Sequence, residues 1–452
     1  MKIIIAGDGK VGETLAKQLS LEDNDVTLID PDAQALELTM QRYDVMGIQG
    51  NCATVNTLKQ AGINDADLLI AATSKDEINL LCCMTGYAVN PNIHTIARIR
   101  NPEYAQQSNL MKNAFGLSLS VNPERRAAIE IGRLLRYPGF LKRETFAKGR
   151  VEIVELRIDE NSRLKNVQLK NLNNIVRCKV LVCTVVRGGR AITPNGNFIL
   201  LEGDRIFVTA PSDILSLLLK NLGIIPHKVK NVMIAGGSRI SYYLANYLLS
   251  SGMSVQIIEQ DYDRCVELAD LLPKATIINA DASDQETLDS EGIDTADAIV
   301  TLTGMDELNM IISLYADSCN VPQVITKLGR TENSRMLDNL PIGSVISPKN
   351  ICADIIVQYV RAMNNTAGAA VSVHSIADGQ SEAIEFVVDE NTLHCGEMLK
   401  DIKTKDGTLV VCITHNGVIE IPNGNSSYQV GDTIIVVTNS DTVLYQINDI
   451  FD

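Results

Sequence analysis

The residues best suited to chemistry lie at the start of the chain, where three glycines bracket a predicted turn. Gly7, Gly9 and Gly12 have the spacing G-x-G-x-x-G, and Asp30 ends the next apolar segment. The first glycine permits a tight turn, the second lets backbone amides approach a pyrophosphate, and the third lets a helix pack on the sheet. The helix N-terminus favours phosphate, and a carboxylate like that of Asp30 binds ribose hydroxyls. The pattern predicts a nucleotide site, with an empty Rossmann-like shell as the alternative.

Strands and helices alternate through the first hundred residues as a parallel sheet requires. We expect strands at 2–6, 26–30, 44–47, 66–72 and 95–100, with helices between them, the longest over 73–89. Such alternation is typical of an α/β doubly wound, Rossmann-like sheet, whose ligands bind at the carboxyl ends of the strands. The predicted site comprises Gly7, Asp8, Gly9, Lys10, Val11, Gly12, Asp30, Asn51, Cys52, Thr73, Ser74, Asp76 and Arg98.

Two parts of this site have a second interpretation. The segment 73–79 has the composition of a helix N-cap with acids in the first turn, a role compatible with ligand contact. Arg98 and Arg100 alternate with Ile96 and should share one face of their strand. A buried arginine needs an anionic partner, which is either a ligand phosphate or an acidic side chain of the same domain.

A smaller lobe follows the first sheet. The stripe of apolar residues over 127–135 predicts a helix that stops at Pro138, and the polar, basic segment 142–150 predicts a connector. From 151 to 223 the strands are short, and Asn195-Gly196 signals a tight hairpin turn. These features predict a small α+β domain.

The whole unit then occurs a second time. Gly236, Glu259 and Lys327 follow Gly7, Asp30 and Arg98 by 229 residues each, and the hairpin signal repeats near residue 423. Serines replace the second and third glycines, so the second copy is either a modified ligand site or a structural relic. Its predicted site comprises Gly236, Gly237, Ser238, Arg239, Ile240, Glu259, Asp281, Thr303 and Lys327.

The fold class is therefore a tandem duplication of a Rossmann-like domain followed by a small α+β domain. The apolar helix stripes over 127–135 and 351–363 either cross to a partner domain or pack on their own lobe. The expected segments are a first Rossmann-like domain at 1–122, a crossover helix and connector at 123–145, a small domain at 146–226, a second Rossmann-like domain at 227–346, a second crossover helix and connector at 347–369, and a second small domain at 370–452.

Composition narrows the function classes. A net charge of −15 argues against a nucleic-acid binder, which would carry a basic face. We find no apolar stretch long enough to span a bilayer and no signal peptide, which favours a cytosolic protein. The cysteines lack C-x-x-C spacing, so we expect buried thiols rather than disulfides or metal ligands.

An enzyme and a ligand sensor are both compatible with the glycine pattern. An NAD-dependent oxidoreductase needs a proton-transfer group, yet His94, His227, His374, His394 and His415 form no recognisable catalytic pattern. A duplicated nucleotide fold joined to small lobes suits a sensor whose ligand biases the arrangement of its domains.

The chain resembles the tandem RCK (also called KTN) proteins of the TrkA family. The resemblance covers essentially the whole chain and rests on the glycine turn, Asp30, Gly50-Asn51, the segment 73–79, Arg98, and the Gly-Asp turns at Gly203 and Gly431.

The resemblance implies a non-enzymatic regulatory subunit on the cytoplasmic face of the inner membrane. It implies a homotetrameric ring that gates a membrane-embedded Trk potassium-conducting subunit of the TrkH or TrkG type. It also implies NAD(H), with ATP or ADP as further candidates, bound by the glycine turn and Asp30, with Thr73 and Ser74 lining the far side and Arg98 meeting phosphate or a second ribose. Asn51 departs from the family because it replaces an acid common there.

Overall fold

The computed structural model describes residues 1–22, 24–107, 116–136, 139–224, 228–329, 337, 340–363, 370–439 and 444–452. Contacts divide the chain into one unit of Met1–Ala128 with Ser347–Val360 and another of Ile129–Ile346 with Arg361–Asp452. Four predicted features lie outside the described residues: the helix stop at Pro138, the domain edge at 225–227, His227, and the connector residues 364–369.

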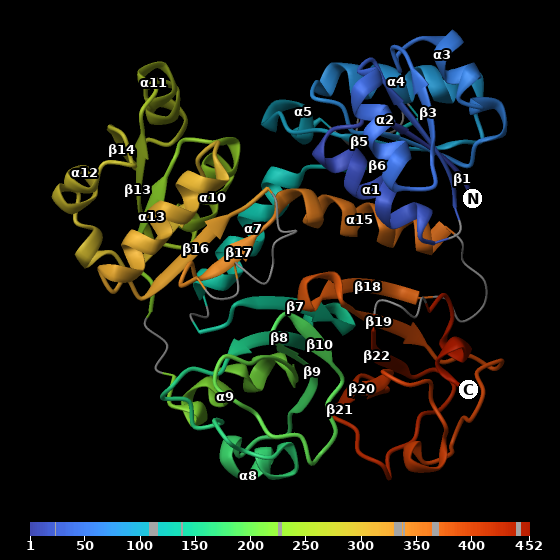
Figure 1. Ribbon diagram of the computed structural model, residues 1–452, viewed down its shortest axis with the longest axis vertical. Helices are drawn as coiled ribbons and strands as arrows, with labels where there is room; N and C mark the ends of the chain where they lie inside the picture. Colours follow the sequence, from blue (N-terminus) through green and yellow to red (C-terminus); the bar gives the residue numbers. More distant parts are fainter. Residues whose placement is uncertain are drawn as a thin grey trace. The chain divides into compact units, whose positions relative to one another are not determined.

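The first Rossmann-like lobe is a six-stranded parallel sheet in the order β3-β2-β1-β4-β5-β6 (Figure 1). Its central strand is a continuous apolar run, as expected for a strand covered on both faces, and Ile5 pairs with Leu28 on one side and Ile70 on the other. The strands are β1 (Lys2–Ala6), β2 (Asp25–Asp30), β3 (Met46–Gln49), β4 (Leu68–Ala71), β5 (His94–Arg98) and β6 (Leu119–Val121). The helices are α1 (Lys10–Ser20), α2 (Ala33–Arg42), α3 (Val55–Gln60), α4 (Asp76–Val89) and α5 (Pro102–Gln106).

The first small lobe is an antiparallel sheet in the order β10-β9-β11-β8-β7, packed with two short helices. The α+β prediction is confirmed. The strands are β7 (Lys142–Phe146), β8 (Val151–Arg157), β9 (Leu181–Arg187), β10 (Arg190–Ile192) and β11 (Arg205–Pro211), and the helices are α8 (Leu172–Val176) and α9 (Leu215–Leu222).

Two local predictions in this lobe are wrong. The polar segment predicted as a connector forms edge strand β7, because its charged side chains have partners: Arg143 pairs with Glu152 of β8. The Asn195-Gly196 segment does form a tight turn, in which the Phe198 amide donates to the Asn195 carbonyl at 3.0 Å, but the strands on either side, β10 and β11, are not neighbours, so the turn is not a hairpin. The tight hairpin turn lies at Gly188 and its neighbour Gly189, both at positive φ, between β9 and β10.

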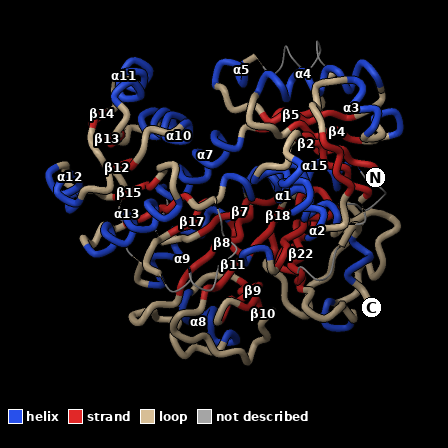
Figure 2. The backbone as a smooth tube through the Cα atoms, turned by 45° about the horizontal axis from the view of Figure 1, so that its top comes forward, coloured by secondary structure: helices blue, strands red, loops and turns tan. Residues whose placement is uncertain are grey.

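The second copy repeats both lobes, with strand orders β14-β13-β12-β15-β16-β17 and β18-β19-β22-β20-β21. The predicted tandem duplication is therefore confirmed, and Figure 2 shows the strands of the four sheets in red. The strands are β12 (Asn231–Ala235), β13 (Ser254–Glu259), β14 (Thr276–Asn279), β15 (Ala298–Thr301), β16 (Gln323–Lys327), β17 (Ser344–Ile346), β18 (Ala370–Ile376), β19 (Ser381–Val387), β20 (Leu409–His415), β21 (Val418–Glu420) and β22 (Thr433–Asn439). The helices are α10 (Arg239–Ser250), α11 (Tyr262–Leu271), α12 (Gln285–Ser290) and α13 (Asp306–Ser318).

The two small lobes share one apolar core to which matching residues of both copies contribute, among them Phe146 and Ile376. Polar contacts match as well. Arg150 donates to the Gly417 carbonyl at 2.7 Å, and Gln380, at the corresponding position of the second copy, donates to the Gly189 carbonyl at 3.1 Å. Reciprocal contacts of this kind are typical of a two-fold interface, here formed within one chain.

Two crossover helices, α7 (Pro123–Arg136) and α15 (Pro348–Met363), connect the lobes. In the second unit, Gln323 of the second Rossmann lobe donates to the Leu134 carbonyl of α7 at 3.0 Å. In the first unit, the Tyr359 hydroxyl of α15 lies 2.9 Å from Nδ1 of His94. Each crossover helix thus packs on the Rossmann lobe of the other copy. In the described ranges, none of the helices combines the length and the apolarity that a membrane span requires.

Candidate nucleotide site

The glycine turn after β1 is built so closely that two of its glycines cannot carry a side chain. Gly7 has φ +102°, and a Cβ on Gly12 would lie 1.8 Å from the Gly7 carbonyl oxygen. Gly9, which precedes α1, would place a Cβ in open space. Gly7 and Gly12 therefore hold the helix against the sheet, while Gly9 leaves the helix N-terminus open to a ligand.

Asp30 ends β2 beside this turn and organises the loops around it. One carboxylate oxygen accepts the Asp8 amide at 2.7 Å, and the other accepts the Asp32 amide at 2.9 Å. A carboxylate oxygen can accept more than one hydrogen bond, so capacity remains for a ribose hydroxyl. The turn and the acid lie where the strand order reverses between β1 and β4, which is the usual ligand crevice of such a sheet.

Asp8 carries an unusual carboxyl group within the turn. Burial, with the nearby charge of Asp30 adding to it, raises the pKa of Asp8 to about 6, although a hydrogen bond from Thr39 opposes the shift. Its Oδ2 atom is buried without a hydrogen-bond partner among the described residues. A carboxyl group that protonates this readily adds less negative charge to the glycine turn than an ordinary aspartate would.

We predict that Asp8→Asn stabilises the first lobe at pH 8. Because the folded-state pKa lies above the unfolded value, stability declines as pH rises from about 4 to about 6, and the penalty persists above that range. The variant should gain about 1 to 2 kcal/mol over the wild type at pH 8, and the gain should shrink towards pH 4. Urea unfolding across this range measures it, and a gain independent of pH would contradict the assignment.

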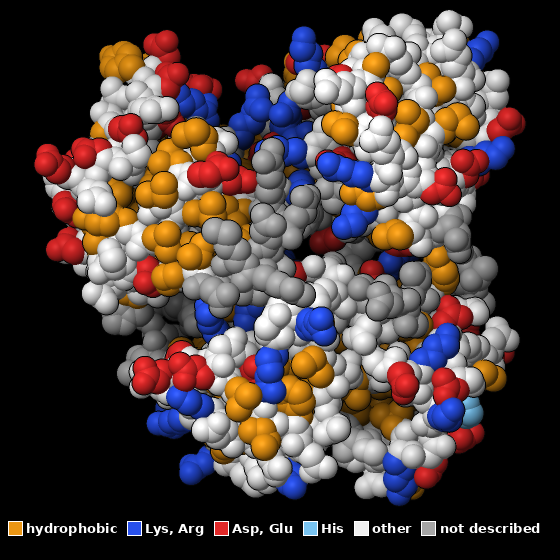
Figure 3. Space-filling model, viewed as in Figure 1, with side chains coloured by type: hydrophobic (Ala, Val, Ile, Leu, Met, Phe, Trp, Pro, Cys, Tyr) orange, Lys and Arg blue, Asp and Glu red, His pale blue; other side chains and the backbone are white. Residues whose placement is uncertain are grey.

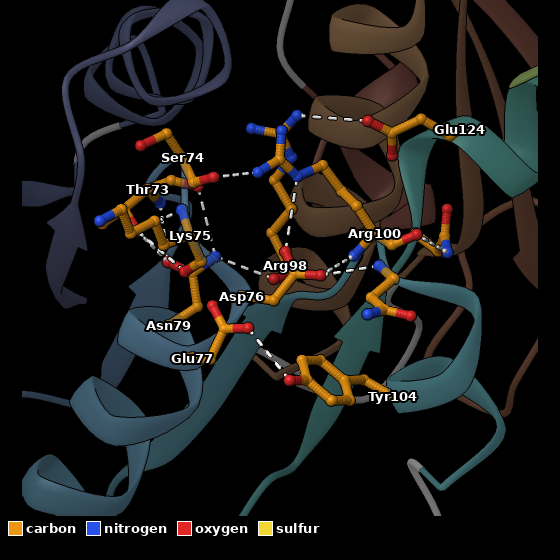
Figure 4. A network of polar contacts seen from close by, with 12 residues as sticks. Thr73, Ser74, Lys75, Asp76, Glu77, Asn79, Arg98, Arg100, Tyr104 and Glu124 are labelled. Atoms are coloured by element: carbon orange, nitrogen blue, oxygen red, sulfur yellow. Dashed lines mark hydrogen bonds and ion pairs between the residues drawn. The ribbon is translucent and has the colours of Figure 1, made fainter. Parts of the chain in front are cut away.

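The segment after β4 forms a polar network around Asn79 rather than a simple N-cap (Figure 4). Oδ1 of Asn79 accepts hydrogen bonds from the amide and the hydroxyl of Thr73, at 2.8 and 2.7 Å, and its Nδ2 donates to the Arg98 carbonyl at 2.9 Å. The residue preceding α4 is Lys75, whose side chain makes no capping bond. Asn79 thus ties the end of β4 to the end of β5.

The prediction that Arg98 and Arg100 share a strand face is wrong, because β5 ends at Arg98. Arg100 turns back to Asp76 and to the Ser74 carbonyl. Asp76 also accepts the Arg100 amide at 2.8 Å. Nη2 of Arg98 lies 3.6 Å from a carboxylate oxygen of Glu124, so Arg98 has an acidic partner, which comes from crossover helix α7 rather than from the same domain (Figure 4).

The remaining predicted residues of the first site differ in exposure. Lys10 is the first residue of α1 and is exposed, whereas the next residue of this helix, Val11, is buried. Asn51 is exposed after β3, and its side chain accepts the Ala53 amide at 3.0 Å. Cys52 is buried, and a hydrogen bond with the Cys82 thiol lowers its pKa. The chain topology thus gathers the predicted residues at one edge of the sheet.

The glycine turn of the second copy is closed by side chains. Ser241 is fully buried, and its hydroxyl donates to the Gly236 carbonyl at 2.5 Å, so this hydrogen bond ties the helix to the strand. Ser238 caps α10 through the Ser241 amide. Glu259 accepts the Gly237 amide at 2.5 Å, as Asp30 accepts that of Asp8.

Other predicted residues of the second copy also have internal partners. Thr303 repeats the network of Thr73 through Asn309, and Lys327 donates to the Thr303 carbonyl. Asp281 accepts the Ser283 amide at 2.8 Å, which holds the pKa of its carboxyl below the ordinary value. Arg239 is exposed and Ile240 is buried at the start of α10.

Sequence reasoning missed two charged residues at these sites. Glu124 follows the proline that opens α7, and only the fold brings it to Arg98. Arg264 of α11 donates to the Gly237 carbonyl at 2.6 Å and so lies across the second glycine turn, where the first copy has Ala35. No spacing rule links either residue to its site.

Comparison with known families defines the class of protein. The TrkA-N domain matches residues 3–118 and 232–348, and the TrkA-C domain matches residues 153–223 and 383–448. The chain therefore belongs to the family of Trk potassium-uptake regulatory proteins with tandem TrkA-N and TrkA-C domains, and the predicted resemblance is confirmed.

Individual relatives extend over the full chain. It is 30% identical to the Trk system potassium uptake protein TrkA of Haemophilus influenzae, covering 100% of this chain and 98% of the relative. It is 31% identical to the protein of the same name from Vibrio alginolyticus, covering 96% and 95%. The crystal structure of the GsuK RCK domain shares the fold, with a TM-score of 0.62 and 16% identity over 97% of this chain and 92% of that one.

Proposed function

We propose that this chain binds nucleotide at its first Rossmann lobe and, through that binding, regulates a potassium-conducting membrane partner. One observation carries the proposal. The glycine turn, with Gly9 left open and Asp30 beside it, lies at the crevice where a parallel sheet of this order takes its ligand. The bound phosphate would be held by backbone amides at the start of α1, and the ribose by Asp30.

The ligand we propose is NAD(H), with ADP or ATP as further candidates. GsuK, which shares the fold, has been solved bound to NAD and bound to ADP. The residues proposed to line the site are those predicted from sequence, with Thr73 and Ser74 on the far side and Arg98 towards phosphate. The second copy is proposed as the weaker site, since Arg264 and the serines occupy its turn.

The proposed partner is a membrane-embedded Trk subunit of the TrkH or TrkG type, with this chain on the cytoplasmic face as a homotetrameric ring. The names of the relatives, potassium uptake proteins of the Trk system, support this assignment. Basic and acidic side chains are interspersed on the face drawn in Figure 3, and the net charge is −15, which speaks against nucleic acid as the partner. Ligand-dependent rearrangement of the lobes would drive gating.

We propose the same domain division as the sequence analysis, with one change. The first small domain begins with β7 at Lys142 rather than at residue 146, because that strand pairs along β8. We keep the other boundaries, after 122, 226, 346 and 369, as the sequence analysis gave them, and those after 226 and 369 lie outside the described residues.

The alternative function is that of an NAD-dependent oxidoreductase, and the positions of the described histidines argue against it. Such an enzyme needs a proton-transfer group near the nicotinamide. His94 begins β5, at the end of that strand opposite Arg98. The other described histidines belong to the second small lobe, where His374 contacts Glu144 and His415 contacts Asp432.

We predict that Asp30→Arg weakens nucleotide binding at the first site tenfold or more. The change removes the acceptor for the ribose and the two amide bonds of the turn, and hydrogen bonds to a charged group contribute about 1.5 to 3 kcal/mol each. Calorimetric titration with NADH measures the affinity. Asp25→Arg, the same charge change at the opposite, exposed end of β2, is the control. Equal affinity in both variants would refute the site.

A further inference from the structure

Arg98 and Glu124 form a loose ion pair at the edge of the first site. The two side chains are 18% and 14% exposed, yet their closest nitrogen and oxygen lie 3.6 Å apart, beyond ordinary hydrogen-bond distance. Nε of Arg98 and Oε2 of Glu124 are both buried without a hydrogen-bond partner among the described residues. Each charge is therefore largely removed from water while its hydrogen-bonding capacity is poorly used.

A guanidinium in this state should readily exchange its partner. Phosphate offers paired oxygens that match the planar donors of arginine, and the resulting bidentate contact is stronger than a single long ion pair. The Arg98 backbone would not have to move, because its carbonyl is held by Asn79 and its strand pairs with β4 and β6. Only the side chain needs to change partner.

Glu124 lies on crossover helix α7, so a change of partner by Arg98 would affect the start of this helix. It is the second residue of α7, whose first turn belongs to the first unit of the chain. Residues 129–136 of the same helix belong to the second unit, where Leu134 accepts a hydrogen bond from Gln323. One continuous helix, α7, therefore contains both Glu124 and the residues that pack on the second Rossmann lobe.

The second copy of the unit lacks this arrangement. Both crossover helices begin with a proline, and the residue after it is Glu124 in α7 but Lys349 in α15. The cation at the end of the fifth strand, Lys327, donates instead to the Thr303 carbonyl. The acidic competitor is thus a feature of the first copy, the copy whose glycine turn is open.

We propose that Glu124 competes with nucleotide phosphate for Arg98, so that phosphate binding breaks the Arg98–Glu124 pair and releases the first turn of α7. This inference rests on the proposed nucleotide binding at the first site and adds the step that couples binding to the crossover helix. Arg98 is the binding residue, and Glu124 is a positioning residue that acts through it.

Calorimetric titration of the full chain with ADP and with adenosine tests the competition. Glu124→Gln should strengthen ADP binding about five- to tenfold, the effect expected for loss of a partly buried competing charge. Adenosine, which lacks phosphate, should bind the variant and the wild type equally. Glu103→Gln removes one carboxylate from an exposed position of the same lobe and should leave ADP affinity unchanged, which controls for net charge.

The decisive comparison places Glu124→Gln in an Arg98→Gln background, where the gain in ADP affinity should disappear. A gain that persists there, an equal gain for adenosine, or no gain at all would overturn the competition while leaving nucleotide binding intact. Absence of binding of NADH, NAD, ATP and ADP by the wild type would overturn the proposed function itself, and this inference with it. Hydrogen exchange at the amides of residues 124–128 should also increase when ADP binds, and unchanged exchange would refute release of α7.

Discussion

Replacing Gly9 by alanine should weaken nucleotide binding at the first site tenfold or more while changing stability by less than about 1 kcal/mol. The added Cβ meets no protein atom within 4 Å, and φ at this position, −85°, is accessible to alanine, so the fold should tolerate it. The methyl group would instead occupy the space through which the pyrophosphate approaches the amides of α1. Calorimetric titration with NADH, paired with urea unfolding, measures both quantities.

Gly12→Ala is the matched comparison, because this substitution should lower the stability of the fold, whereas Gly9→Ala should weaken binding. Its Cβ would lie 1.8 Å from the Gly7 carbonyl oxygen, so helix and strand must separate, at a cost of about 1 to 3 kcal/mol in the free energy of unfolding. If Gly9→Ala binds NADH as tightly as the wild type, the ligand does not cross this turn.

Arg143→Met should destabilise the first small lobe by about 3 to 5 kcal/mol, because it leaves Glu152 buried without its partner. The two side chains are 8% and 6% exposed and meet at 2.5 Å. Arg143 also donates to the Arg133 carbonyl at 3.3 Å. Chemical unfolding followed by circular dichroism measures the loss.

The control for this prediction lies in the same lobe. Lys165 and Glu202 form an ion pair of which the side chains are 33% and 53% exposed, so Lys165→Met should cost less than about 1 kcal/mol. The double replacement Arg143→Met with Glu152→Leu should recover much of the stability, since no charge remains buried. Similar losses of stability for Arg143→Met and Lys165→Met would show that burial of the Arg143–Glu152 pair does not determine its contribution to stability.

Sequence periodicity predicted the architecture because regular elements follow local rules. The glycine turn, the apolar strands and the second set of the same signals specify two doubly wound sheets, each followed by a small lobe. Asp30 could be placed beside the glycine turn because the spacing of a strand–helix–strand unit fixes where the second strand ends. The family resemblance rested on these same residues.

The predictions that failed depended on contacts between distant segments. The charges of β7 suggested a solvated connector, since nothing near Arg143 in sequence reveals that Glu152 neutralises it across the sheet. Glu124 carried no signal at all, because Arg98 reaches it only through the fold. The role of Ser241 also depends on a contact, since its hydroxyl gives the Gly236 carbonyl a partner that a glycine cannot supply.

The most direct test of the account is calorimetric titration of the intact chain with NADH, NAD, ATP and ADP separately, with turnover assayed on the same samples. We expect saturable binding of at least one of these nucleotides, with at least one equivalent per chain, and no steady consumption of NADH or ATP. A second equivalent would show that the serine turn of the second copy still binds. If none of the four nucleotides binds, the glycine turn is a structural element and the proposed function is wrong.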